Sequence, residues 1–308
     1  MEKQNRRGRK LETLSIRDIA HLCCHLGLSK TQLERLLAST DSNYREGEIT
    51  VDGKKRKLAI PREPLMTALR NLNRLMQRLR FPPYMYGGLS GHSNIDNARA
   101  HTSTWAVLRA DIKDFFPSID RARVRRVFEE RLRCSASVAD ILAQLCTYQD
   151  KLPQGAPPST VIANLAIEHL SFRLYRLATK HGATYTQFVD DITISGPGHV
   201  ESLEPLVAKI IEEEGFRCHP DKLYTRRHTQ EQLVTGVRVN SGCDVPSDKI
   251  EEVRAQIKRC GEEIAQGKAV SEKVLRTLDG KIAYITRLNR GSGKFLRRRF
   301  RVLQDQVV

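Results

Sequence analysis

The sequence predicts an α+β fold, with long helices around a small sheet. Residues 184–195 are mostly apolar and β-branched around an Asp-Asp pair, which predicts two strands joined by a tight turn. Residues 105–112 form a short apolar run typical of a buried strand, and from Ser247 almost to the end the apolar spacing is helical. With 308 residues, the chain is long enough for two or three subdomains and a sizeable core.

The first hundred residues are predicted to be mostly helical, with one hairpin. Residues 15–39 form two short helices separated by a break at Gly27 and Ser29. We interpret this pair as a helical lid rather than a helix-turn-helix, because no recognition-helix chemistry stands out. The other elements are a basic tail at 1–10, a hairpin at 44–61 with its turn at Asp52-Gly53, a helix at 63–79 that ends before Pro82-Pro83, and a Gly- and His-containing connection at 84–104.

Helices and strands alternate in the second part of the chain. The expected helix at 157–180 opens with prolines, whose missing N–H groups cost nothing there, and closes at Gly182. The other predicted elements are helices at 120–132 and 203–214, a strand at 233–240, and a C-terminal helical region interrupted near Gly291-Gly293.

Basic residues outnumber acidic ones, 52 to 36, and the formal net charge is +16. A surplus that large implies a polyanionic partner, since self-repulsion is otherwise a cost without return. Nucleic acid and an acidic membrane surface are the two candidate polyanions. The membrane is disfavoured because the chain has no run of about 18 apolar residues and its basic residues do not gather on one amphipathic helix.

Cysteine usage and the N-terminus indicate where the protein resides. The seven cysteines include no Cys-x-x-Cys pair, and their odd number and irregular spacing argue against a disulfide framework or a zinc site. The polar N-terminus MEKQNRRGRK lacks the apolar core of a secretory signal. We therefore expect reduced thiols and a cytoplasmic protein.

Asp190 and Asp191 lie between segments that favour strands. Adjacent side chains on a strand point to opposite faces, so a tight turn is needed to bring both carboxylates to one site. Two like charges in a largely apolar hairpin are costly unless a cation compensates them, and Mg²⁺ prefers oxygen ligands. An ordinary exposed Asp-Asp turn explains this segment equally well.

Asp111 ends the predicted strand at 105–112 and is followed by two consecutive aromatic residues. A carboxylate at a strand end is a common metal ligand and an equally common helix cap. Together with Asp190 and Asp191, it makes the three-carboxylate arrangement that a two-metal polymerase needs. In such an enzyme one metal lowers the pKa of the primer hydroxyl, and both stabilise charge on the α-phosphate.

Gln154 and Gly155 lie where a loop enters the predicted 157–180 helix. Backbone N–H groups and the side-chain amide can contact a nucleotide or a template base there. By itself the segment is better explained as a Pro/Gly turn before a helix.

In this order and spacing, four segments resemble the palm motifs of reverse transcriptases. They are Asp111-Ile-Lys-Asp-Phe-Phe116, Leu152-Pro-Gln-Gly155, Phe188-Val-Asp-Asp191 and His219-Pro-Asp-Lys-Leu-Tyr-Thr225. Three further segments narrow the resemblance to bacterial retron reverse transcriptases, over roughly residues 30–290: Asn97-Ala-Arg-Ala-His101, Val234-Thr-Gly236 and Leu278-Asp-Gly-Lys-Ile-Ala-Tyr284.

Three segments depart from the family pattern. Phe188 and Val189 stand where Tyr and Ala are usual; the ring is kept, so metal binding should survive, while fidelity and primer contact are open to change. Pro157-Pro-Ser-Thr160 replaces Pro-x-Ser-Pro, which alters the start of a helix without implying inactivity. His219 replaces the Asn that usually precedes the late Lys.

The resemblance implies a right-hand polymerase with fingers, an antiparallel-sheet palm and a helical thumb. The boundaries that we expect are an N-terminal helical extension at 1–40, fingers at 41–104, a palm with an interleaved fingers segment at 105–240, and a basic helical thumb at 241–308.

It also implies roles for residues around the active site. Asp111 and Asp190 match the positions that bridge two Mg²⁺ ions, with Mn²⁺ as an alternative, and Asp191 matches the third carboxylate. Phe116 matches the bulky residue that excludes a ribose 2′-OH and so selects dNTPs, while core packing is the alternative for Phe116 and the role expected of Phe115.

Four more residues match nucleotide-binding positions. Gln154 matches the residue under the incoming nucleotide. Arg56 resembles the fingers residue that grips the triphosphate, with Lys57 as a nearby competitor and a solvated charge run as the alternative. Lys222 can protonate the leaving pyrophosphate as a general acid.

RNA contacts are expected from two regions. Asn97 and His101, at helical spacing, can face one RNA element or make structural contacts. The stretch from Gly280 to Gln304 contains eight basic residues. As a set they are expected to follow the phosphates of a stem, and we assign RNA binding to Arg287, Arg290, Arg297, Arg298 and Arg299.

The function implied is that of a retron enzyme. Such an enzyme reverse transcribes its own structured non-coding RNA, primes from an internal guanosine 2′-OH and makes branched msDNA for anti-phage defence. The implied partners are that RNA and its product, dNTPs, a separate effector protein and host ribonuclease H, with no membrane. The rival hypotheses are another bacterial reverse transcriptase, of group II intron or defence type, and a non-catalytic RNA-binding scaffold for an effector.

Overall fold

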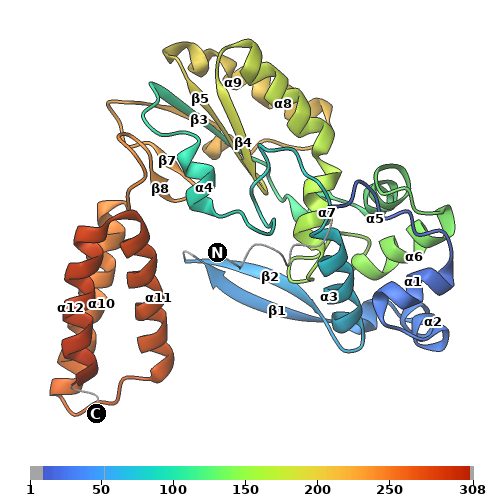
Figure 1. The fold of residues 1–308 in the computed structure, drawn as a ribbon, viewed down its shortest axis with the longest axis horizontal. Helices are drawn as coiled ribbons and strands as arrows, with labels where there is room; N and C mark the ends of the chain where they lie inside the picture. The colour runs from blue at the N-terminus through green and yellow to red at the C-terminus, as the bar shows by residue number, and fades with distance from the viewer. Residues whose placement is uncertain (1–9, 52, 306–308) are drawn as a thin grey trace, which may run out of the picture.

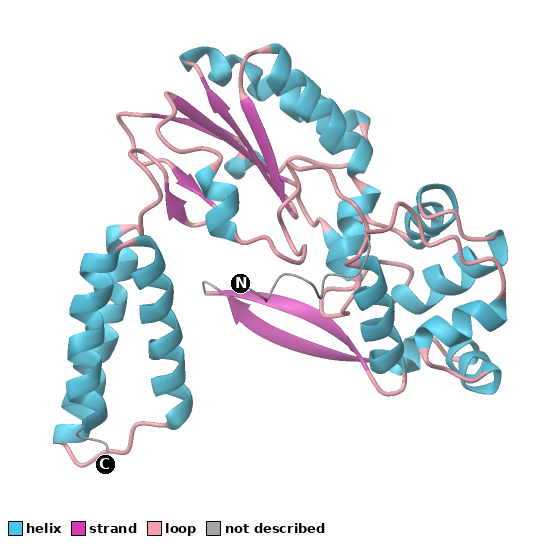
Figure 2. Cartoon of the chain, in the orientation of Figure 1, coloured by secondary structure: helices cyan, strands magenta, loops and turns pink. Residues whose placement is uncertain are grey.

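The computed structural model describes residues 10–51 and 53–305. Residues 1–9 of the predicted basic tail and the turn residue Asp52 lie outside this part of the chain. Figure 1 shows a sheet flanked by helices, a hairpin beside a group of short helices, and a separate C-terminal bundle of three helices. Figure 2 shows the same arrangement by secondary structure and confirms the predicted α+β class.

A four-stranded antiparallel sheet, in the order β4-β5-β3-β6, carries the predicted aspartates. Its strands are β3 (Ala106–Asp111), β4 (Thr184–Phe188), β5 (Asp191–Gly196) and β6 (Tyr224–Arg227). The strands predicted at 105–112 and 184–195 are confirmed. Strand β6 was not predicted, because this edge strand is polar and largely exposed and has no apolar run.

The two faces of the sheet differ because successive side chains of a strand point to opposite sides. Leu108, Ala110, Ile192 and Ile194 belong to the main hydrophobic core. Helices α8 (Glu168–Lys180) and α9 (Glu204–Glu213) pack on the sheet and on each other. The opposite face carries polar side chains, including the ones that form the site: Arg109, Asp111, Thr186, Asp191, Thr193, Ser195 and Tyr224.

The single helix predicted for 157–180 is wrong in one respect. The chain forms α7 (Ser159–Ala166) and α8, separated at Ile167, which has φ −113° and ψ 16°. Residues on both sides of the break are apolar at helical spacing, so the pattern alone gave no sign of it. Gly182 follows the end of α8 with φ 65°, as a helix-closing glycine does.

The N-terminal elements largely follow the prediction. Gly27 ends the first helix with φ 70°, and Ser29 forms a capping box with Gln32 at the start of the second. The bounds are α1 (Ile19–Leu26), α2 (Lys30–Ala38), β1 (Tyr44–Val51), β2 (Lys54–Pro61), α3 (Leu65–Met76) and α4 (Asn94–Arg99). Helix α4 lies within the segment predicted only as a connection.

The helix predicted at 120–132 is α5 (Arg121–Arg126), which continues as a π-helical turn at Val127–Arg131. Asp120 caps it by accepting a hydrogen bond from the backbone N–H of Arg123 at 2.7 Å. A helix absent from the prediction, α6 (Ala136–Cys146), packs against α5 and α2.

Two predictions for the C-terminal region need correction. The strand expected at 233–240 is a small hairpin, β7 (Leu233–Val234) and β8 (Val237–Arg238), turned at Thr235 and Gly236, which both have positive φ. The helical region consists of α10 (Ser247–Ala265), α11 (Glu272–Leu288) and α12 (Arg290–Asp305). The break at 266–271 was not predicted. The break predicted near Gly291-Gly293 lies at Asn289, so both glycines belong to α12.

The three-helix bundle has a hydrophobic core of its own, formed by side chains such as Ile257, Ile282 and Phe300. Across residues 10–51 and 53–305, no helix combines the length and the apolar character needed to cross a bilayer. The seven cysteines are all free thiols.

Candidate active site

The three predicted aspartates lie at one end of the four-stranded sheet. Asp111, the last residue of β3, is directly opposite Asp191, the first residue of β5. Asp190 precedes Asp191 in the turn from β4, and its carbonyl oxygen accepts the backbone N–H of Ile112 at 3.3 Å. The strand ends therefore bring together residues that lie about 80 positions apart in the sequence.

The turn between β4 and β5 is tightly held. Val189 has φ 62°, which is unfavourable for a β-branched residue. Gly87 packs against it so closely that a Cβ at position 87 would lie 2.3 Å from the Val189 backbone nitrogen. The carbonyl of Gly87 in turn accepts a hydrogen bond from the buried Asn164 side chain at 2.8 Å. The segment around Gly87 thus fixes the turn that carries the aspartates.

The three aspartate carboxylates lie close together and are half-buried. Burial, followed by the charges of Asp111 and Asp191, raises the pKa of Asp190 to about 6. Burial also raises the pKa of Asp191, although the Arg109 guanidinium opposes this. Carboxylates that resist ionisation for these reasons are stabilised by a bound cation.

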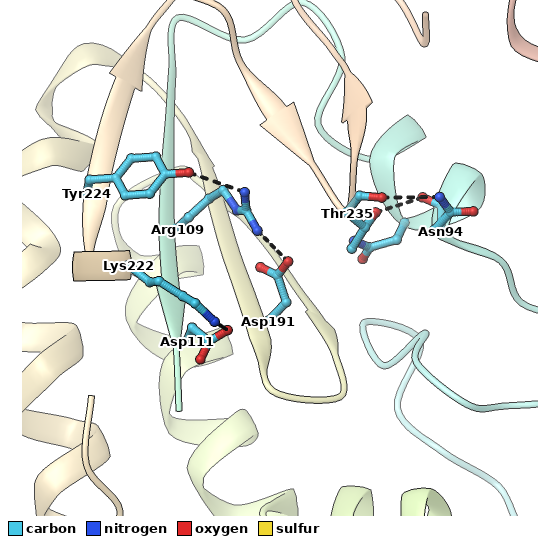
Figure 3. A network of polar contacts seen from close by, with 8 residues as sticks. Asn94, Arg109, Asp111, Asp191, Lys222, Tyr224 and Thr235 are labelled. Atoms are coloured by element: carbon cyan, nitrogen blue, oxygen red, sulfur yellow. Dashed lines mark hydrogen bonds and ion pairs between the residues drawn. The ribbon is translucent and has the colours of Figure 1, made fainter. Parts of the chain in front are cut away.

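Two side-chain cations pair with these carboxylates (Figure 3). Nζ of Lys222 lies 2.5 Å from Oδ2 of Asp111, and Nη2 of Arg109 lies 2.6 Å from Oδ2 of Asp191. Lys222 was predicted as a site residue and Arg109 was not. A charged residue inside the apolar segment 105–112 was the signal that could have identified Arg109.

As the side chains stand, no group of three or more His, Cys, Asp or Glu residues in the described part of the chain could hold a metal ion. The donors nevertheless fit a divalent cation. Oδ1 of Asp191 is buried without a hydrogen-bond partner, and carboxylate oxygens are the ligands that hard divalent ions take. A bound ion would compensate Asp111, Asp190 and Asp191 together.

Residues 30–239 match the family model described as reverse transcriptase (RNA-dependent DNA polymerase). The chain belongs to the reverse transcriptase family. Members of this family depend in general on divalent metal ions and have a right-hand polymerase fold, as predicted. The antiparallel β4-β5-β3-β6 sheet fits the palm expected of this fold, and the C-terminal helical bundle corresponds to its expected thumb.

Similar curated proteins are retron reverse transcriptases, which confirms the predicted resemblance. Retron Mx65 reverse transcriptase of Myxococcus xanthus is 32% identical over 271 residues, 80% of this chain and 61% of that protein. Retron Ec86 reverse transcriptase of Escherichia coli is 28% identical over 283 residues, 87% of this chain and 88% of that protein. Retron Se72 reverse transcriptase of Salmonella heidelberg is 28% identical over 232 residues, covering 72% of this chain.

The chain spans 61% of the length of the Se72 and Mx65 proteins. Among solved structures, telomerase from Candida albicans, in complex with a fragment of telomeric RNA, aligns with a TM-score of 0.46 and 12% identity. That alignment covers 90% of this chain and 64% of the telomerase chain, and it is too distant to define a function.

The residues predicted to bind the nucleotide lie partly in loops beside the palm sheet and partly on the β1–β2 hairpin. Phe115 is buried in the core while Phe116 is half-buried, so of the two only Phe116 is partly open to solvent. The pair lies in a short turn after β3 rather than in the strand itself. Gln154 is half-buried, and its carbonyl accepts the backbone N–H of Ala59 in β2 at 2.8 Å.

Arg56 and Lys57 are both exposed on β2, on opposite faces of the β1–β2 hairpin. Figure 1 shows this hairpin on the side of the molecule toward which the β4–β5 turn points. The hydrogen bond between Ala59 and Gln154 joins the hairpin to the loop of the second palm motif. Their contact with a triphosphate remains a prediction.

The predicted RNA contacts of Asn97 and His101 need correction, because both side chains are fully buried. The two ring nitrogens of His101 lie 2.7 Å from the hydroxyls of Ser195 and Thr186, on the polar face of the palm sheet. Burial lowers the pKa of His101 to about 3, so its ring is neutral. Helical spacing does place residues 97 and 101 on one face, but that face points into the protein.

Asn94, which was not predicted, connects the palm to the thumb. Its side-chain N–H groups donate to the carbonyl of Thr235 at 3.1 Å (Figure 3). They also donate to the hydroxyl of Tyr284, in α11, at 2.7 Å. The Thr235 hydroxyl donates back to the Asn94 carbonyl at 3.0 Å, and Asn97 reaches the same hydroxyl at 3.4 Å. The three retron-like segments therefore meet in one joint between palm and thumb.

Basic side chains line an open groove of about 900 Å³ between α11 and α12. Four of the five arginines assigned to RNA binding contribute to it, but Arg299 does not and packs over the Phe295 ring at 4.8 Å. Arg297 is also paired with Asp279. The basic residues of the groove are Arg287, Arg290, Lys294, Arg297, Arg298 and Arg301.

Proposed function

We propose that this chain is a retron-type RNA-directed DNA polymerase that uses a two-metal mechanism. The observation that carries the proposal is the meeting of Asp111, Asp190 and Asp191 at one end of the palm sheet. The ions that we propose are two Mg²⁺, with Mn²⁺ as an alternative. Family membership and retron relatives support the assignment to this class of polymerase.

The aspartates would hold the ions, and bound ions would lower the pKa of the attacking hydroxyl and stabilise charge on the α-phosphate. Phe116 is proposed to exclude nucleotides with a 2′-OH, and Gln154 to lie under the incoming dNTP. Lys222 would leave Asp111 when metal binds. Its exposed side chain could then donate a proton to the pyrophosphate.

Arg56 or Lys57 on the hairpin is proposed to contact the triphosphate. The division into an extension at 1–40, fingers at 41–104, palm at 105–240 and thumb at 241–308 is part of this proposal. The thumb groove is proposed to contact RNA phosphates, since none of Arg287, Arg290 and Arg298 is neutralised by an acidic partner among the described residues.

The retron assignment carries finer proposals about substrate and partners. The template would be a structured non-coding RNA, priming would start from an internal guanosine 2′-OH, and the product would be branched msDNA for anti-phage defence. A separate effector protein and host ribonuclease H would complete the system in the cytoplasm.

Primer extension on the cognate RNA tests the polymerase assignment. With Mg²⁺ and dNTPs, we expect cDNA from the wild type and about 1000-fold less from Asp190→Asn, since a metal-held charge contributes several kcal/mol to the transition state. The control is Asp150→Asn, whose side chain is 81% exposed and pairs with Arg121 at 3.7 Å. Equal cDNA from wild type and Asp190→Asn would contradict the assignment and favour a non-catalytic scaffold.

Nucleic acid that co-purifies with the protein tests the retron assignment. A branched hybrid sensitive to both RNase and DNase is expected. Unbranched cDNA would favour another bacterial reverse transcriptase, and RNA without DNA would favour the scaffold.

The palm–thumb joint gives a prediction about processivity. Tyr284→Phe removes the hydroxyl that accepts the Asn94 hydrogen bond, which contributes about 1 kcal/mol. We expect shorter products when rebinding is blocked by a trap, while incorporation of the first nucleotide changes less than twofold. The control is Tyr175→Phe in α8, a partly exposed ring that stacks on Tyr84. Products of unchanged length would show that the joint does not hold the thumb during synthesis.

A further inference from the structure

Arg109 is a charged residue in the middle of a palm strand. It precedes Asp111 by two residues in β3, so both side chains lie on the same, polar face of the sheet. In the antiparallel register it is opposite Thr193 of β5 and Tyr224 of β6. Its side chain is 25% exposed. A charge this enclosed needs partners to compensate it.

Arg109 uses its guanidinium fork on two partners from the neighbouring strands (Figure 3). Nη2 donates to Oδ2 of Asp191 at 2.6 Å, and Nη1 donates to the hydroxyl of Tyr224 at 3.2 Å. Because the guanidinium is planar and rigid, these two contacts fix its orientation. Arg109 therefore joins β5 to β6 across the strand that carries Asp111.

Lys222, the second cation at the site, is held differently. Its side chain is 45% exposed and makes one ion pair, with Asp111, at the end of a flexible stem. Such a contact is easily exchanged for a metal ion. Arg109 is more enclosed and has two anchors, so it is expected to stay in place.

The two oxygens of the Asp191 carboxylate have different surroundings. Oδ2 accepts the Arg109 hydrogen bond, whereas Oδ1 is buried and has no hydrogen-bond partner. A buried carboxylate oxygen without a partner is costly unless a ligand completes it. The arrangement leaves Oδ1 as the oxygen of Asp191 that a divalent ion can take.

We propose that Arg109 is a positioning residue for the metal site, which holds Asp191 through Oδ2 and presents Oδ1 to the divalent ion. Tyr224 holds the Arg109 guanidinium in this orientation. When the ion binds, Lys222 leaves Asp111, whereas Arg109 stays on Asp191. The inference rests on the proposed two-metal function. It adds a residue outside the four palm motifs.

Two explanations of the role of Arg109, as a positive charge or as a residue that positions Asp191, predict opposite effects of removing it. If Arg109 acted only as a positive charge, its removal would reduce repulsion of the metal ion and tighten binding. If it positions Asp191, its removal should weaken metal binding by roughly 10-fold or more, as is typical when a partner that orients a metal ligand is lost. The direction of the change therefore distinguishes the two.

Mg²⁺ binding can be measured without nucleic acid, as the rise in melting temperature of each variant above its own metal-free value. For Arg109→Gln we expect the half-saturating Mg²⁺ concentration to rise about 10-fold. Arg109→Lys, which keeps the charge but loses the fork, should change in the same direction, and Tyr224→Phe should show a smaller rise. Referring each variant to its own metal-free protein separates metal binding from any loss of stability.

The matched control is Arg227→Gln. Arg227 lies at the far end of β6 and donates to Glu201 at 2.6 Å. The variant therefore loses an ion pair between arginine and a carboxylate, but one that lies away from the aspartates. Its half-saturation should equal that of the wild type. In primer extension, Arg109→Gln should recover part of its lost activity at raised Mg²⁺, whereas a purely structural defect would not respond to Mg²⁺.

An unchanged or lower half-saturation in Arg109→Gln, or wild-type behaviour of Arg109→Lys, would overturn the proposal. The outcome is separable from that of the proposed function. If the wild type binds Mg²⁺ in an Arg109-dependent way but makes no cDNA on any RNA, the polymerase assignment fails while the role of Arg109 in the metal site stands.

Discussion

Asp190→Asn should make the metal-free protein more stable at neutral pH while abolishing cDNA synthesis. The folded protein holds Asp190 at a pKa of about 6, against an ordinary value of 3.8, because of burial and the charges of Asp111 and Asp191. At pH 7.5 this difference corresponds to about 3 kcal/mol of lost stability. Replacing the carboxylate with a neutral amide of the same shape removes that cost.

The dependence on pH has a definite sign. Between pH 3.8 and about 6 the folded protein binds a proton at Asp190 that the unfolded chain does not, so stability falls as the pH rises. Above pH 6 the full cost is present. The advantage of Asp190→Asn should therefore be largest above pH 6 and shrink toward pH 4.

Thermal unfolding in EDTA and in Mg²⁺, from pH 4 to pH 8, measures both effects. In EDTA at pH 7.5 we expect Asp190→Asn to melt roughly 4–8 °C above the wild type. Mg²⁺ should stabilise the wild type more than the variant. The exposed control Asp150→Asn should show no pH-dependent gain. A variant that melts below the wild type at pH 7.5 would show that Asp190 is not held against its ionisation.

The aspartates were predictable because charged residues stand out where the surrounding pattern is apolar. Asp111, Asp190 and Asp191 end or interrupt strands of apolar residues, and the order of the motifs indicated that they meet. Arg109 carries the same kind of signal inside its strand. Its role depends on Asp191 and Tyr224, which are 82 and 115 residues away, so the contact could not be predicted from its local sequence.

Asn97 and His101 show a different limit of sequence patterns. Their spacing indicates a shared helix face but not whether that face meets solvent or protein. The partners that bury them, Thr235, Ser195 and Thr186, are 85 to 138 residues distant. An RNA contact and a buried polar contact require the same residue types, so only the fold distinguishes them.

The errors in the predicted helices have related causes. The break between α7 and α8 lies at Ile167, inside an unbroken apolar pattern. Helix α12 contains Gly291 and Gly293, and a Cβ at position 293 would lie 2.4 Å from the Thr286 hydroxyl oxygen. That glycine allows close packing of α12 on α11 and does not end a helix.

Gly87→Ala should disable the active site without touching a predicted catalytic residue. A Cβ at position 87 would lie 2.3 Å from the Val189 backbone nitrogen and 2.7 Å from the Phe188 carbonyl carbon, distances that real contacts do not reach. Either the β4–β5 turn or the Gly87 segment must move, and the turn carries Asp190 and Asp191. Since a displacement of about 1 Å can cost about 100-fold in rate, we expect at least that loss in primer extension.

The same change should lower stability by about 1–3 kcal/mol, as overpacking does. The matched control is Gly261→Ala in α10, where the new Cβ would meet only Leu303 at an ordinary 3.7 Å and should leave activity unchanged. A double variant tests the cause. Trimming Val189 to Ala removes a side-chain clash but leaves the clash with the backbone nitrogen, so Gly87→Ala/Val189→Ala should remain inactive. Recovery of activity in the double variant would show that the Val189 side chain, and not the backbone of the turn, is what requires glycine at position 87.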